Sequence, residues 1–140
     1  MVDALRRAQR MVTEAGTVVD VHPSSAPAFL DVGGAHVGEL DAAAAVVRHA
    51  AADAATAAVI DEGLFEVAAQ AEFVYYTYAD TVDELCHHIA ANWRDSRIGD
   101  DTAERSRWVL EGAARHVRPR VVEHVRLTAL RVRRWPGSRR

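Results

Sequence analysis

The sequence predicts an α/β or α+β domain with a small mixed β-sheet, a β-hairpin insertion and three to five helices. Three observations lead to this prediction. Alanine-rich segments with helical spacing alternate with short apolar segments that are typical of strands. The Gly33-Gly34 pair between two apolar-containing arms favours a tight type I′ hairpin. The length of 140 residues, 49% of them hydrophobic, suits one domain with a hydrophobic core.

The first elements are a helix over residues 3–15 and a strand over residues 18–21. Apolar residues recur at helical spacing in the first segment, and Gly16 is expected to end that helix. The strand is a nearly continuous apolar run, which is typical of a strand buried on both faces. In the hairpin that follows, we expect Val32 opposite Ala35, Asp31 opposite His36 and Leu30 opposite Val37.

A long alanine-rich helix is expected next, capped by Asp41 and ended by Gly63. Residues 64–79 then read as a long strand with an alternating pattern. The apolar residues expected to share one face of this strand are Phe65, Val67, Ala69, Ala71, Phe73 and Tyr75.

The C-terminal part of the chain is expected to add two helices and a final strand. Thr81 and Glu84 form a capping-box pattern at the start of the first helix. A second, short helix is expected over residues 102–114, and its Trp108 is expected to cover the long strand. Residues 121–133 read as the final strand. The domain is therefore predicted to span residues 1–134, with residues 135–140 as a disordered basic tail.

Composition limits the class of protein. Cys86 is the only cysteine, which excludes a disulfide framework and favours a cytoplasmic location. No run of about 18 apolar residues occurs, so we expect no membrane span. The adjacent Cys86, His87 and His88 are spaced badly for a metal site, because neighbouring helical residues point about 100° apart. We predict no metal site.

Charge is distributed unevenly along the chain. Residues 1–114 contain 8 arginines and 19 acidic residues, whereas residues 115–140 contain 9 arginines and a single acidic residue. Arg126, Arg131 and Arg133 are therefore candidates for binding an anion or nucleic acid. The alternative, which we favour, is internal pairing with acidic residues such as Glu66 and Glu72 on the neighbouring strand.

Residues 5–21, with the sequence LRRAQRMVTEAGTVVDV, resemble the C-terminal half of a class I S-adenosylmethionine-dependent methyltransferase. In that family a helix and a glycine turn lead into the fifth strand. The resemblance implies that residues 64–78 and 121–133 are the sixth and seventh strands, which form an antiparallel pair. It further implies that the final strand lies between the other two, and that the hairpin is an insertion.

The resemblance does not extend to the cofactor site. The family binds its cofactor through a glycine-rich turn after its first strand, and this sequence has none, since Gly33-Gly34 belongs to a hairpin. No cofactor-binding residue is therefore assigned, and S-adenosylmethionine is expected only if a partner supplies the missing half. Without that half, the strand over residues 18–21 has an open edge. We predict an interface there, formed by Val18, Val19 and Val21.

Two groups of side chains are candidates for a site. Asp20 and His22 lie on one face of their strand, and could act as a general acid–base pair or only as a structural one. Tyr75, Tyr76, Tyr78 and Trp93 are candidates for an aromatic ligand pocket, or belong to the core and its rim.

The function expected from these patterns is a non-catalytic dimerisation or partner-binding module, with room for a small-molecule cleft. The partner is either a second copy, joined through the exposed strand edge, or a separate cofactor-binding subunit. One alternative is a subunit of a split methyltransferase, enzymatic only when a second chain completes it. Another is an arginine-rich protein that binds anions or nucleic acid.

Overall fold

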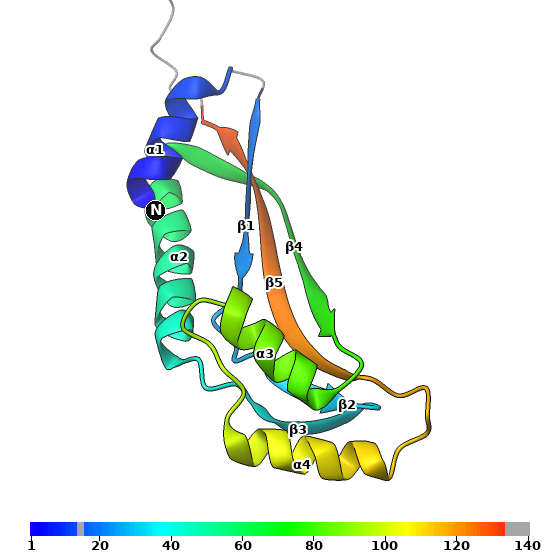
Figure 1. Ribbon diagram of the computed structural model, residues 1–140. Helices are drawn as coiled ribbons and strands as arrows, with labels where there is room; N and C mark the ends of the chain where they lie inside the picture. Colours follow the sequence, from blue (N-terminus) through cyan, green and yellow to red (C-terminus); the bar gives the residue numbers. More distant parts are fainter. Residues whose placement is uncertain (14–15, 134–140) are drawn as a thin grey trace, which may run out of the picture.

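The computed structural model describes residues 1–13 and 16–133 of the chain (Figure 1). The expected tail over residues 135–140 lies outside this part. The fold is α+β, with four helices and a five-stranded open sheet. Along the chain the elements are α1 (Val2–Met11), β1 (Thr17–Pro23), β2 (Phe29–Val32), β3 (Ala35–Glu39), α2 (Ala43–Asp61), β4 (Phe65–Tyr78), α3 (Val82–Asn92), α4 (Asp100–Glu111) and β5 (Pro119–Val132).

Strand β5 is the centre of the sheet. Along one side it pairs with β4 over nearly its whole length, and along the other it pairs with β1 and then with β2. Strand β3 pairs with β2 and forms the outer strand at that end. The described pairs are all antiparallel, so the expected mixed sheet is wrong in this respect. The expected position of the final strand, between the first strand and the long one, is confirmed.

Helices cover the two faces of the sheet at different places (Figure 1). We call the face that carries Leu130 face A and the face that carries Leu127 face B. On face A, α1 and α2 enclose a core. That core is formed by Leu5, Val59, Phe65 and Leu130. On face B, α3 and α4 pack only at the end of the sheet where β2 lies, over Leu30 and Val121.

A bulge in β4 changes which of its side chains lie together. Val67 lies opposite Leu130, whereas Ala69 lies opposite Ala129, so one extra residue is accommodated between them. Leu130 and Ala129 point to opposite faces of the sheet. The expectation of one continuous apolar face is therefore wrong. Phe65 and Val67 lie on face A, and the residues on face B are Ala69, Ala71, Phe73 and Tyr75.

The expected helix ends are partly correct. The capping box of Thr81 and Glu84 is confirmed, and so is the helix stop at Gly63, whose φ is +73°. Helix α2 starts at Ala43 without a side-chain cap, so the predicted cap by Asp41 is wrong. The Asp41 carboxylate instead accepts a hydrogen bond from Arg97, and the two backbones form an isolated bridge.

The ends of α1 and α4 also differ from expectation. Helix α1 ends at Met11, with Val12 as its C-cap, and not at residue 15. Helix α4 covers Asp100–Glu111, and its Trp108 is 75% exposed, so Trp108 does not cover the long strand as expected.

The hairpin has the expected turn but a shifted register. Gly33 and Gly34 have φ of +63° and +94°, as a type I′ turn requires. Asp31 lies opposite His36 as expected, but an irregularity before Asp31 places Gly38 opposite Leu30. The expected pairing of Leu30 with Val37 is therefore wrong.

Helix α2 has nineteen residues and is, by length and composition alone, long and apolar enough to cross a membrane. The sequence-based exclusion of a span was therefore too strict. In this fold one side of α2 packs on the sheet through Ala52, Ala55 and Val59. A polar residue, Asp53, also bonds to the sheet from this helix.

Candidate functional site

Asp20 and His22 lie side by side on face A of β1, under α2. His22 Nδ1 is 3.2 Å from Asp20 Oδ2, and His22 Nε2 is 2.9 Å from Oδ1 of Asp53 on α2. The Thr56 hydroxyl, also on α2, donates a hydrogen bond of 2.8 Å to Asp20 Oδ2. The His22 side chain is only 11% exposed. The imidazole therefore lies between two carboxylates at the interface of helix and sheet, bonded through Nε2 to Asp53, while its buried Nδ1 makes no hydrogen bond within the described residues.

Arg126 extends this group of polar side chains across β5. Its guanidinium donates to Asp53 Oδ1 at 2.7 Å and to Glu72 Oε1 at 3.0 Å. The hydrogen bond that the guanidinium donates to Glu72, reinforced by the charge of Asp53, raises the pKa of the guanidinium. We call Asp20, His22, Asp53, Thr56, Glu72 and Arg126 the polar network. It joins α2 to β1, β5 and β4.

The polar network has the chemistry of a structural contact that fixes α2 to the sheet. Each nitrogen of His22 faces a carboxylate, and the His22 and Asp20 side chains are only 11% and 12% exposed, so a substrate has little access to the pair in this structure. Sequence analysis identified Asp20 and His22 but missed Asp53 and Thr56. Their signal was present, since two polar residues spaced three apart in an alanine-rich helix lie on one helical face.

The outer edge of β1 is open within the described residues. The backbone N–H of Ser24 donates to the carbonyl of His124 on β5, so the even-numbered residues of β1 direct their backbone groups toward β5. Val19 and Val21 therefore direct theirs outward, where no described strand pairs with them. Their side chains are 57% and 52% exposed, whereas Val18 packs against the core of face A.

Face B beside this edge is apolar; it is exposed along β1 and β4, whereas on β5 Val125 is buried and Leu127 and Ala129 are half-buried. In register across β1, β5 and β4 it presents Val19, Ala129 and Ala69, then Val21, Leu127 and Ala71, then Pro23, Val125 and Phe73. A solvent-facing side of an antiparallel sheet is normally polar. Here Phe73 and Tyr75 are 43% and 53% exposed. This surface has the composition of a side that another layer covers.

Glu123 lies at one end of this apolar surface, opposite Tyr75. It forms no hydrogen bond or ion pair with the described part of the chain. Burial raises the pKa of its carboxyl above the ordinary value of 4.5. At the other end of the surface, Arg131 lies opposite Glu66, with 3.6 Å between Nη1 and Oε1.

The predicted aromatic pocket residues are not brought together. Tyr76 and Tyr78 lie on face A, with ring centroids 5.9 Å apart, whereas Tyr75 lies on face B. The Arg120 guanidinium lies 4.5 Å from the centre of the Tyr76 ring and donates to Asp31. Trp93 follows α3 and packs against a different core.

The predicted anion-binding arginines are largely engaged inside the protein. Arg126 belongs to the polar network, and Arg131 lies beside Glu66. Internal charge pairing, which the sequence analysis favoured, is therefore confirmed for these two. Arg133 is exposed at the end of β5.

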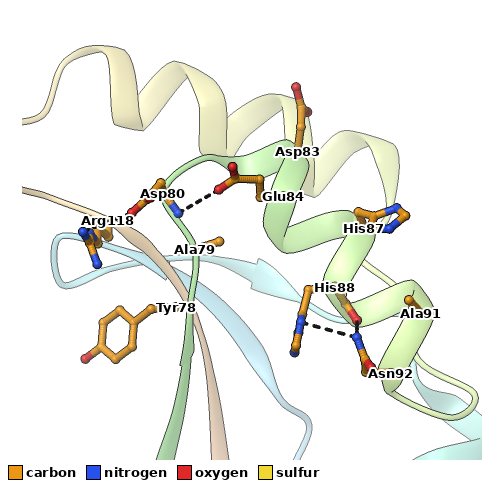
Figure 2. A pocket seen from close by; sticks show the side chains of 10 residues that line it. All are labelled: Tyr78, Ala79, Asp80, Asp83, Glu84, His87, His88, Ala91, Asn92 and Arg118. Carbon is orange, nitrogen blue, oxygen red and sulfur yellow. Dashed lines mark hydrogen bonds and ion pairs between the residues drawn. The ribbon is translucent and has the colours of Figure 1, made fainter.

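A hollow on the surface lies between the end of β4 and α3 (Figure 2). In this view His87 and His88 point in different directions, and Asn92 donates to the backbone carbonyl of His88. Within residues 1–13 and 16–133, no three His, Cys, Asp or Glu side chains gather in a way that could hold a metal ion. Cys86 packs against the core of face B, and burial raises the pKa of its thiol.

Comparisons with known proteins add no relatives to this description. No family model matches the chain, and no curated protein or solved structure is similar enough to count as a match.

The polar network predicts a clear effect of Asp53→Asn. The substitution removes the carboxylate shared by His22 and Arg126, and we expect it to lower the free energy of unfolding by about 2 kcal/mol. Chemical denaturation measures this. The matched control is Asp41→Asn, which breaks an exposed ion pair with Arg97. We expect it to lower the free energy of unfolding by less than about 1 kcal/mol. Equal losses in both variants would contradict the structural role of the network.

The raised pKa of Glu123 predicts a pH-dependent effect of Glu123→Gln. The folded chain holds this proton more tightly than the unfolded chain, so the carboxyl favours folding at low pH and loses that contribution as the pH rises through its folded pKa. In the dilute chain, the variant should therefore melt at a higher temperature than the parent at neutral pH. The difference should shrink toward pH 4.5. A variant that is less stable than the parent at neutral pH would contradict this.

Proposed function

We propose that this chain is a protein-interaction module that binds a second polypeptide chain through β1. The observation that carries the proposal is the position of Val19 and Val21. Their side chains are more than half exposed on an apolar surface, and their backbone groups point to an edge that no described strand covers. Open apolar edges and faces favour association with another chain.

The sheet also has an open edge along β4, which differs from the edge of β1 in how it is protected. Strand β4 carries the bulge near Val67, and its acidic Glu66 and Glu72 lie along it. Bulges and charged side chains discourage pairing at an edge. Strand β1 has no bulge, and its acidic Asp20 is held under α2. The differences favour β1 as the binding edge.

The strand order supports the finer proposal that the fold is methyltransferase-like. The resemblance required the final strand to lie between the first strand and the long strand, and β5 lies between β1 and β4. A split methyltransferase completed by a second chain is therefore the second candidate. In that case the partner is a cofactor-binding subunit, and it too would bind along β1.

The first test of the module is its mass in solution. We expect light scattering to report a dimer for the parent and a monomer for Val19→Arg, because a charged side chain cannot be buried without a partner. Val47→Arg is the matched control, since Val47 is 69% exposed on α2, away from β1. It should remain dimeric. If the parent stays monomeric at all concentrations and binds no other polypeptide chain, the proposal is refuted.

Binding of S-adenosylmethionine to this chain alone distinguishes an interaction module from a methyltransferase. We expect calorimetric titration of the chain with S-adenosylmethionine to give no heat beyond dilution, because no glycine-rich strand–helix turn occurs in the sequence. Tight binding to this chain alone would overturn the non-catalytic proposal and favour an enzyme.

A further inference from the structure

Face B carries its charges in a pattern that suits a second copy of the same face. On β5 the side chains along this face are Glu123, Val125, Leu127, Ala129 and Arg131. Glu123, whose side chain has no partner among the described residues, lies at one end, and Arg131 lies at the other beside Glu66. Leu127 is midway between Glu123 and Arg131. If two such faces stack with their strands antiparallel, each acid lies over a base.

We propose that face B binds face B of a second copy, across a two-fold axis that passes over Leu127 perpendicular to the strands. In this arrangement Glu123 lies over the partner subunit's Arg131, and the reverse contact follows by symmetry. The proposal rests on the proposed function, because it takes the second polypeptide to be another copy of this chain; it places the contact on face B, which includes Val19 and Val21, and not along the backbone edge of β1.

The sizes of the β4 side chains on face B also suit this two-fold axis. Phe73 lies level with Val125, and Ala69 lies level with Ala129. Antiparallel stacking therefore places Phe73 over the partner's Ala69, a large ring over a small side chain. Tyr75, level with Glu123, lies over the partner's Glu66, and its phenol can donate to that carboxylate. Large residues facing small ones allow two layers to interdigitate.

The other two-fold axis that stacks these faces is excluded by charge. An axis parallel to the strands places Glu123 over the same residue of the partner subunit and brings like charges together. Such contacts cost several kcal/mol when desolvated. Stacked sheets cross at about 30°, which displaces Glu123 sideways from the partner's Arg131. The long Arg131 side chain can span this displacement.

The area of face B predicts a weak dimer. Eight residue steps along β5 give a length of about 27 Å, and three strands give a width of about 14 Å. The flat footprint is thus roughly 400 Å² per copy, about half of the roughly 800 Å² that each partner buries in a standard specific interface. Association is therefore expected to be weak, and the test requires a concentration series.

The test exchanges the charges of Glu123 and Arg131 by substitution and measures dimerisation by sedimentation velocity. We expect Glu123→Arg and Arg131→Glu, each alone, to weaken dimerisation about tenfold or more, since each places like charges opposite one another. The double variant carrying both substitutions should restore dimerisation to within about threefold of the parent. Restoration also shows that loss in the single variants is not due to misfolding.

A proline variant separates stacking from pairing at the edge. The N–H of Val19 points outward from β5, so Val19→Pro blocks a strand from pairing there without removing a bond to β5. The stacked dimer should persist in this variant. A dimer that Val19→Pro abolishes, and that the charge exchange leaves unchanged, overturns the inference but leaves the proposed function intact. A chain that binds no second polypeptide overturns both.

Discussion

The fold depends on the pairing of β5 along both of its sides. This strand bonds to β4 on one side and to β1 and β2 in succession on the other. It therefore holds together segments that are more than one hundred residues apart in the sequence. Since β5 is the last element described, the sheet cannot be completed until the rest of the chain is present.

The polar network fixes the second layer onto this sheet. Asp53 on α2 bonds to His22 on β1 and to Arg126 on β5, and Arg126 reaches Glu72 on β4. The Asp53 carboxylate thus ties the helix directly to two strands, and through Arg126 to a third. An alanine-rich helix has little apolar surface to bury, and directional bonds of this kind fix its position on face A.

The same layering leaves face B open beside β1. Helices α3 and α4 cover only the end around Leu30 and Val121. Beyond that end, Val19, Val21 and Phe73 are exposed despite the apolar composition of the face. The half-covered sheet is the observation on which the proposal of an interaction module rests. The candidate catalytic pair lies on the covered face instead.

The sequence by itself determined several local features. The Gly33-Gly34 turn, the stop at Gly63 and the capping box at Thr81 were predictable because each depends on residues close together in the chain. The position of the final strand was predictable too, through the resemblance. Only the tertiary structure decided the bulge between Val67 and Ala69, which moves Phe73 and Tyr75 to the face opposite Phe65. It also brought Asp53 to His22 and left the Glu123 side chain without a partner among the described residues, because such contacts depend on how distant segments pack and not on local spacing.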